Sequence, residues 1–536
     1  MHMAVRWLRP FKRSVDGLRR QITVALLALV VAGCGSDDVE LGTLGAVEGF
    51  LGGVAADEPR AAAVGRDVLS AGGTAADAVV AMYFASAVTL PSAASLGGGG
   101  VCVAFDSDKI DAKAIVFLPR GSNAVTAASD RPSAVPASVR GFVVLHARFG
   151  RLRWEQLLAP AESLARFGFP ASRALASDLT PLRRALQSDP AFVRIFSSPG
   201  GEGLVAEGDP LIQVELAAVI SHIRTQGAGA FYTGPLAQRL VDAVKAAGGS
   251  LTVEELRDYA PSVLETIQVP WGNEVAHFAP PPAAGGAVAA QMWALLEDRG
   301  FGRASPERRQ AMLVDIGSRV MADRETWMRA DGSATVDPQS LVAPSRLKDI
   351  MAGPAAGSQV RPENASAASF VAFDREGSAA ACAVTLNSPF GTGRVAPGTG
   401  IVLAAAPGPG GRGAEGLGPM LIVNENIGAF HFAGAASGGI AAPSALVGVA
   451  ARAMLGDVPL ADAVAANRAL GTADPSLVYH EAGADPALRE RGGRAVAAPE
   501  LGRVNAAACL RGFPPYEDRC AAVADRRGHG LATGSF

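Results

Sequence analysis

The order in which two hydrophobic periodicities follow one another most restricts the fold of this 536-residue chain. Up to about residue 366 the apolar residues recur mainly at i, i+3, i+4 and i+7, the spacing of amphipathic helices. Beyond that point they alternate with a period of two, which indicates strands, before helical patterns return. Helices before strands at the start and after strands at the end favour stacked sheets covered by helices over a βαβ fold.

Within this order the individual elements can be predicted. Two helices are expected within 57–90, separated by Gly72 and Gly73, with Thr74 as the N-cap of the second helix. Further helices are expected at 135–149, 154–167, 236–247, 440–454 and 459–470. Strands are expected at 101–105, 114–118, 370–373, 380–386, 420–423 and 429–433.

The N-terminus has the features of an export signal. Six basic residues precede an apolar stretch at 22–32, about half the roughly 20 residues that a spanning helix needs. Small residues then lead to Cys34, a pattern typical of a lipobox. We therefore expect residues 1–33 to be a signal peptide, Cys34 to carry a lipid that anchors the chain to a membrane, and 34–41 to be a tether. An ordinary signal with a chance cysteine, or a short anchor helix, is the alternative.

This signal also predicts the location and the charge of the mature protein. The chain should face outside the cytoplasm, on the periplasmic side of the envelope, and Gly35 after Cys34 favours the outer membrane slightly. Without residues 1–33 the formal net charge falls from −3 to about −8. Nucleic acid is therefore not expected as a partner.

Four cysteines remain after lipidation, and disulfides persist outside the cytoplasm. Cys509 and Cys520 flank a turn-rich segment between two apolar runs, so a bridge that closes a hairpin is expected there. Cys102 and Cys382 are expected to be buried small hydrophobic residues in strands.

No metal and no cofactor are expected. The seven histidines lack ligand spacing such as HExxH. Residues 408–413 match the dinucleotide pattern GxGxxG, but Pro407 and Pro409 remove the strand-to-helix context that such a site needs.

Eight sequence blocks occur in a fixed order and together resemble the γ-glutamyltransferase (glutathione hydrolase) family over roughly residues 42–536. The blocks are 69–78, 95–100, 149–161, 230–234, 247–256, 280–286, 386–393 and 524–534. The resemblance implies an α/β (α+β) fold, the four-layer αββα sandwich of the N-terminal-nucleophile hydrolases. It also implies a precursor that cuts itself into a large region, 42–366, and a small region, 367–536, of the same sandwich.

The resemblance further implies the chemistry. A threonine at the new N-terminus, activated by its own α-amine, would take a γ-glutamyl group from glutathione or a similar compound and pass it to water or an amino acid. Arg120 matches the arginine that pairs with the substrate α-carboxylate. Asn387, in the sequence Thr385-Leu386-Asn387, matches an asparagine of the family's active site, and Thr385 is a candidate substrate-binding residue. Gly438 and Gly439 match the oxyanion-hole pair. Arg120 as a surface charge and the glycines as a tight turn are the structural alternatives.

The position of the nucleophile departs from the family. Counting back seven residues from Asp374 gives Ala367, which has no hydroxyl and cannot be acylated. Ser366 is adjacent and is the candidate nucleophile, and Ser369, at the place of a family histidine, is a weaker one. Pro409 stands where the family has the aspartate that binds the substrate α-amino group.

Three hypotheses follow from these departures. The first is an envelope lipoprotein of this family whose glutathione-hydrolase activity is weak or lost. The second is an active, acylase-like amide hydrolase that uses Ser366 on a substrate without a free α-amino group. The third is a non-catalytic lipoprotein that uses the old pocket to bind a ligand or to act as a scaffold.

Overall fold

The computed structural model describes residues 49–535 apart from 126–128, 202, 354–366, 408–415, 475, 484–493, 515 and 517–519. The predicted signal peptide, Cys34 with its tether, Ser366 and Pro409 lie outside the described residues. None of the helices in the described part of the chain is long and apolar enough to cross a bilayer.

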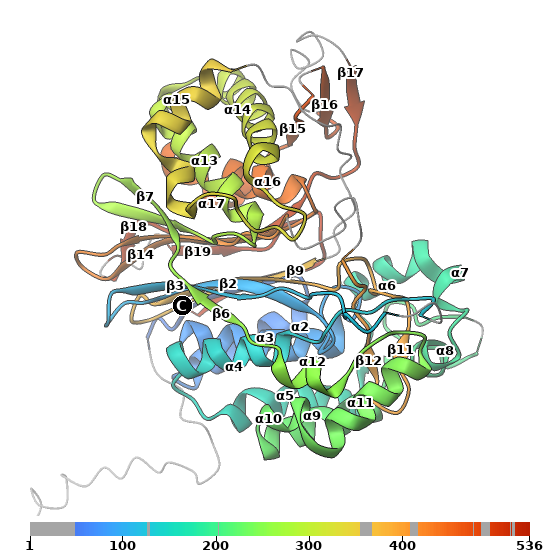
Figure 1. Ribbon diagram of the computed structural model, residues 1–536. Helices are drawn as coiled ribbons and strands as arrows, with labels where there is room; N and C mark the ends of the chain where they lie inside the picture. Colours follow the sequence, from blue (N-terminus) through green and yellow to red (C-terminus); the bar gives the residue numbers. More distant parts are fainter. Residues whose placement is uncertain are drawn as a thin grey trace, which may run out of the picture. The chain divides into compact units, whose positions relative to one another are not determined.

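Two antiparallel sheets form the middle of the molecule (Figure 1). The first sheet has the order β20(Leu531–Ser535), β1(Gly52–Ala56), β9(Ala367–Asp374), β10(Ala379–Thr385), β2(Gly99–Asp106), β3(Asp111–Phe117) and β6(Ser262–Leu264). The second has the order β19(Cys520–Val523), β18(Arg503–Phe513), β14(Ala429–Ser437), β13(Met420–Asn424), β8(Glu274–Phe278) and β7(Ile267–Trp271). Each of these two sheets contains strands from both sides of position 366, so neither is formed by one predicted region alone.

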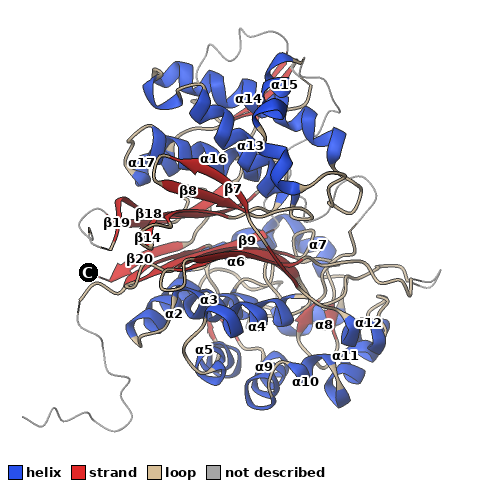
Figure 2. Ribbon diagram, turned by 60° about the vertical axis from the view of Figure 1, so that its left-hand side comes forward, coloured by secondary structure: helices blue, strands red, loops and turns tan. Residues whose placement is uncertain are grey.

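Helices cover the outer face of each sheet, which confirms the predicted αββα sandwich (Figures 1 and 2). The first sheet is covered by α2(Pro59–Ser70), α3(Ala75–Thr89) and α4(Ser138–Phe149), with α5(Trp154–Phe167), α9(Val214–Gln226), α10(Gly229–Tyr232), α11(Gly234–Ala246) and α12(Val253–Asp258) beyond them. The second is covered by α13(Ala284–Asp298), α16(Ala441–Ala450) and α17(Leu460–Ala465), with α14(Pro306–Trp327) and α15(Pro344–Ala352) beyond them. At the periphery are α6(Arg173–Leu179), α7(Arg183–Leu186), α8(Pro190–Phe196), β4(Phe169–Pro170), β5(Pro210–Leu211), β11(Val395–Ala396), β12(Ile401–Val402), β15(Ala469–Gly471), β16(Leu477–His480) and β17(Arg494–Ala497).

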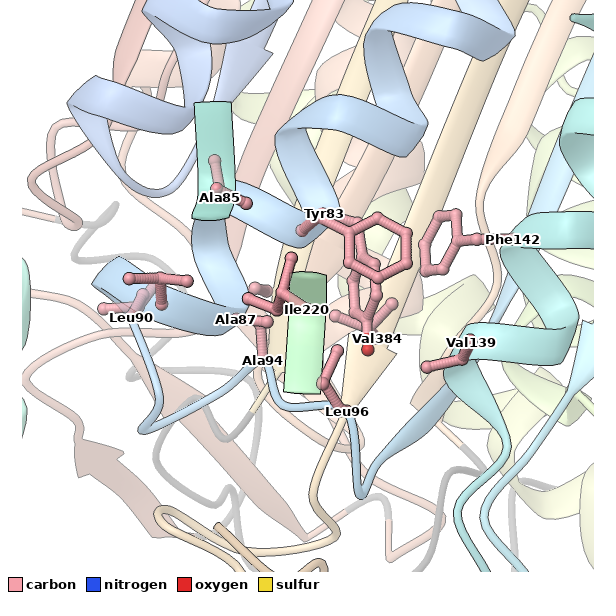
Figure 3. Close-up of a cluster of buried hydrophobic side chains, with 14 of the residues drawn as sticks. Tyr83, Ala85, Ala87, Leu90, Ala94, Leu96, Val139, Phe142, Ile220 and Val384 are labelled. Atoms are coloured by element: carbon pink, nitrogen blue, oxygen red, sulfur yellow. The ribbon is translucent and has the colours of Figure 1, made fainter. Parts of the chain in front are cut away.

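Three hydrophobic clusters fill the spaces between the four layers. In the cluster between the first sheet and its helices, Tyr83 of α3 stacks on Phe142 of α4 with ring centroids 4.0 Å apart (Figure 3). Val384 of β10 belongs to the same cluster. Because the apolar faces of both sheets and of their helices are buried in this way, burial of nonpolar surface stabilises the layered arrangement.

The start of α3 is built as the sequence predicts. The Thr74 hydroxyl accepts a hydrogen bond from the Asp77 amide at 3.2 Å, and the Asp77 carboxylate accepts one from the Thr74 amide at 3.1 Å. The side chain of Asp374, the last residue of β9, accepts a hydrogen bond from the Ala75 amide at 2.9 Å. The N-terminus of α3 is therefore tied directly to the end of β9.

The two disulfides test the cysteine predictions. Cys509 and Cys520 face each other on β18 and β19 and are bonded, as expected. Cys102 and Cys382 are buried in strands, as expected, but they are also bonded to each other, so the prediction of unpaired cysteines is wrong. The sequence shows no proximity between positions 280 residues apart, whereas the β2–β10 register places them directly opposite each other.

One predicted helix is too long. The pattern at 459–470 predicts a single helix, but α17 ends at Ala465 and residues 469–471 form β15. The Arg468 side chain is only 6% exposed. It donates hydrogen bonds to the Val464 and Leu501 carbonyls, at 3.2 and 3.4 Å, which holds this part of the chain in place beyond the helix.

Candidate functional site

The first residue of β9 is the centre of the predicted site. Ala367 lies directly opposite Thr385, the last residue of β10, in the antiparallel ladder. The Thr385 hydroxyl accepts a hydrogen bond from the Asn387 amide at 2.9 Å. The structure therefore brings together Ala367, Thr385 and Asn387, three of the positions that the family motif specifies.

Asn387 is held in an unusual conformation by its neighbours. Its φ is +63°, in the left-handed region that asparagine tolerates better than most residues. The Asn387 side-chain amide donates to the Ala405 carbonyl at 2.9 Å. The Oδ1 atom of Asn387 is buried and has no hydrogen-bond partner within the described structure. This unpaired acceptor is the feature of the site most suited to receiving a donor from a ligand.

A series of backbone hydrogen bonds connects the segment that contains Arg120 to the segment that contains Asn387. The Val135 amide donates to the Arg120 carbonyl at 2.8 Å, and the neighbouring Ala134 amide donates to the Ala404 carbonyl at 2.9 Å. The Ala405 amide in turn donates to the Leu386 carbonyl at 3.0 Å, next to Asn387.

The Arg120 guanidinium itself is exposed. It lies over the ring of Tyr259, 5.2 Å from the centroid. No described carboxylate forms an ion pair with it, so it is available to an anionic group.

Gly438 and Gly439 form the turn between β14 and α16. Their φ angles are +127° and +57°, so both have backbone conformations that residues with a Cβ rarely adopt. A Cβ at Gly438 would lie 2.6 Å from the Gly502 Cα atom. The turn and its packing therefore require this glycine pair whether or not it forms an oxyanion hole.

A buried polar network that the sequence analysis did not identify lies beside the start of β9. Both the amide and the hydroxyl of Ser369 donate to Asp57 Oδ2, at 2.7 and 3.1 Å. The Asn505 side-chain amide donates to Asp57 Oδ1 at 3.0 Å and to the Ser369 hydroxyl oxygen at 2.8 Å. Burial raises the pKa of the Asp57 carboxyl, and the donors and Arg503 oppose that rise.

This network determines what Ser369 can do. Its side chain is fully buried, and its hydroxyl proton is directed to Asp57, so it is not exposed to a substrate. The only sequence signal for the network was the presence of isolated polar residues in alanine-rich runs, at Asp57 and Asn505. Within the described part of the structure, Ser369 therefore has a structural role.

The hollow next to Ala367 is small and charged. Between the described residues its volume is about 10 Å³, and its lining includes Ala367, Asp57, Asp178, Arg503 and His529. A volume of this size holds about one water molecule. Burial raises the pKa of Asp178, which accepts a hydrogen bond from the Ser92 hydroxyl at 2.6 Å.

The layered fold, with Ala367 at the start of β9, indicates the class of the protein. The structure is similar to the crystal structure of a cephalosporin acylase from Bacillus halodurans, with a TM-score of 0.78, 19% sequence identity, and coverage of 94% of this chain and 99% of that chain. It is also similar to γ-glutamyltranspeptidase from Helicobacter pylori, with a TM-score of 0.50, 25% identity, and coverage of 59% and 93%. The protein has the fold of the N-terminal-nucleophile hydrolases.

Comparison of the sequence with known proteins identifies a family within this fold. Residues 61–535 match the family model for γ-glutamyltranspeptidase, so the chain belongs to that family. A glutathione hydrolase proenzyme from Pseudomonas aeruginosa is 30% identical over 383 residues, which are 66% of this chain and 67% of the relative. One from Bacillus subtilis is 30% identical over 399 residues, with 65% and 67% covered.

Proposed function

We propose that this protein is a lipid-anchored envelope member of the γ-glutamyltransferase family that no longer hydrolyses glutathione. In this proposal Arg120 and Asn387, which do not line the small hollow beside Ala367, bind a carboxylate compound whose nitrogen is acylated and uncharged. The observation that carries the proposal is the methyl group of Ala367 at the first position of β9, opposite Thr385.

Loss of the reaction follows from the chemistry of that position. Covalent acyl transfer needs a hydroxyl or thiol nucleophile, and alanine supplies neither. The residues that remain have structural explanations, since Thr385 holds the Asn387 amide and the glycine pair forms an obligatory left-handed turn. Their retention is therefore compatible with a non-catalytic protein.

The nature of the ligand is inferred from the polar groups that remain. Arg120 offers a planar donor suited to a carboxylate. The unpaired Oδ1 of Asn387 needs an N–H or O–H donor. Pro409 in place of an aspartate offers no charge to an ammonium group. An N-acyl amino acid has a carboxylate and a neutral N–H, and so matches these groups better than glutamate or glutathione.

The mature protein, purified from the envelope and examined on a denaturing gel with reductant, tests the loss of activity. We expect one intact chain and no release of aniline from a γ-glutamyl anilide. Two fragments of about 330 and 170 residues, with Ser366 as a new N-terminus, would instead support the acylase-like hypothesis and overturn ours.

Calorimetric titration tests the ligand class. We expect N-acetylglutamate to bind and free glutamate to bind at least tenfold more weakly. The variant Arg120→Met should lose this binding. Arg511→Met is a matched control, because Arg511 is also an exposed arginine over a tyrosine ring, 4.5 Å from the centroid of Tyr516. Equal affinity for both compounds, or equal loss in both variants, would refute the ligand assignment.

The anchor is tested by the mass of the N-terminal peptide. We expect that peptide to begin at Cys34 and to carry the mass of attached acyl chains, and we expect Cys34→Ser to release the protein from membranes. A mature N-terminus elsewhere would show that the export signal is of another kind.

A further inference from the structure

A second polar site lies in the helical layer that covers the second sheet. The mechanism that the family resemblance implies assigns no role to this site. A cavity of about 20 Å³ is enclosed by α14, by α16 with the π-helical turn Ala451–Leu455 that follows it, and by the residues around β15. Its lining includes Leu313, Ser444 and Leu470 together with Gln310, Arg452 and Arg468. The site is thus a mostly apolar cavity with three strong donor side chains.

Arg452 has no anionic partner in the described part of the chain. Its Nη1 donates to the Gly448 carbonyl at 2.9 Å, and its Nη2 donates to Gln310 Oε1 at 2.8 Å. No described carboxylate forms an ion pair with it. A guanidinium that meets only neutral acceptors in a partly buried position retains an uncompensated charge.

The neighbouring carboxylates do not offset this charge, because they are already paired with other arginines. Arg468 is paired with Asp525 at 2.6 Å, and Arg527 is paired with Asp525 at 3.1 Å and with Glu481. Burial lowers the pKa of Arg452 to about 10, and repulsion from Arg468, Arg309 and Arg527 contributes to that lowering.

Gln310 supplies a second, independent observation. Its side chain is 8% exposed, and its Nε2 atom is buried without a hydrogen-bond partner within the described structure. Because a guanidinium can only donate, the contact with Arg452 fixes the amide so that oxygen faces Arg452 and nitrogen does not. A buried N–H donor is therefore left unpaired beside a positively charged cavity.

We propose that this cavity binds a small monovalent anion of the size of chloride, held by the Arg452 guanidinium and the Gln310 Nε2 amide. The volume accommodates about one water-sized particle, so a monatomic anion fits it better than a polyatomic anion such as sulfate. The anion would neutralise Arg452 and satisfy the Gln310 donor at the same time. Since Ala441, Ser444 and Gly448 of α16 form one wall, the anion would also fix the helix that follows Gly438 and Gly439.

The thermal midpoint of the full mature protein tests this site. At constant ionic strength, replacing sodium gluconate with sodium chloride should raise the midpoint along a saturable curve by about 2 °C or more. Gln310→Leu and Arg452→Met should abolish the chloride dependence. Arg319→Met on the same helix is the control, because Arg319 binds the Met351 and Gly353 carbonyls outside the cavity, and it should keep that dependence.

Bromide anomalous diffraction provides a readout that does not depend on the stability of any variant. A crystal of the unaltered protein soaked in sodium bromide should show an anomalous peak in the cavity, in contact with the Arg452 guanidinium and with Gln310 Nε2. A cavity occupied only by water gives no such peak. The absence of the peak, or the same chloride response in all variants, would overturn the proposal.

Discussion

Ala367, at the start of β9, and Thr385, at the end of β10, are directly paired in the antiparallel ladder. The methyl group at position 367 therefore lies beside Thr385, which carries a hydroxyl. The neighbouring elements are intact: Asn387 is hydrogen-bonded to Thr385, and the Gly438–Gly439 turn is formed. Two of the departures from the family bear on the reaction: the methyl group at position 367 and Pro409 in place of an aspartate. These two changes have separable consequences.

Restoring the hydroxyl tests the first consequence. We expect Ala367→Thr to cleave itself partly into fragments of about 330 and 170 residues, because a β-branched residue suits the start of a strand and the glycine turn is present. The variant should still release no aniline from a γ-glutamyl anilide, since self-cleavage needs no partner for a substrate ammonium group. A denaturing gel and an absorbance assay measure both results.

The control for this experiment is Ala367→Val, which has the shape of threonine without the hydroxyl. It should remain a single chain. If Ala367→Thr also remains intact while folding normally, the surroundings of position 367 are no longer competent for the cut.

The Asp57–Ser369–Asn505 network should stabilise the fold at the junction of the two sheets. Asn505→Ala removes donors from a buried carboxylate and should lower the free energy of unfolding by about 2–3 kcal/mol. Ser369→Ala should cost only about 1 kcal/mol, because Asp57 retains the Ser369 amide and the Asn505 amide as donors. Urea unfolding measures both values, and equal costs would contradict this ranking.

The sequence predicts those parts of the fold that depend on local patterns. Apolar spacing locates α4 and α5, and Thr74 as the predicted N-cap locates the start of α3 to the residue. The four-layer arrangement itself comes from the family resemblance, because strand order across 300 residues is not contained in any local period. The overlong helix prediction at 459–470 fails for the same reason, since the position of Arg468 is set by its contacts with distant carbonyls and with Asp525.

In the candidate site, too, the features that depend on local spacing could be predicted and those that depend on distant residues could not. Spacing from Asp374 predicts Ala367 and Asn387 as site positions, and the ladder between β9 and β10 places Ala367 opposite Thr385, two residues before Asn387. The network of Ser369 with Asp57 and Asn505 could not be predicted, since its members are separated by 312 and 136 residues and share no motif. The Cys102–Cys382 bond was missed for the same reason.

His277 on β8 should make the stability depend on pH. It is fully buried, and burial with repulsion from Lys113 lowers its pKa from 6.5 to about 4. Glu425 lies 3.4 Å from Nε2, but it is one-third exposed and does not offset the burial. Between pH 6.5 and 4 the unfolded chain binds this proton and the folded chain does not, so stability falls as the pH falls.

The free energy of unfolding should fall by about 3 kcal/mol as the pH falls from 6.5 to 4, and the full stabilisation is present above pH 6.5. Urea unfolding at pH 7.5, 5.5 and 4.5 measures it. The variant His277→Gln should have a flatter profile, whereas His222→Gln on α9 should keep the profile of the unaltered protein. Parallel profiles for all three proteins would show that His277 does not cause the pH dependence.

The Cys102–Cys382 disulfide joins residues on opposite sides of the predicted cleavage position between 366 and 367. The Cys509–Cys520 disulfide lies wholly on one side. If Ala367→Thr cleaves, its fragments should run as one species on a non-reducing gel and separate only with reductant. Adding Cys102→Ser and Cys382→Ser should separate them without reductant and lower stability by about 3 kcal/mol. Adding Cys509→Ser and Cys520→Ser instead should leave them joined, and separation in that variant would show that the fragments are held by other means.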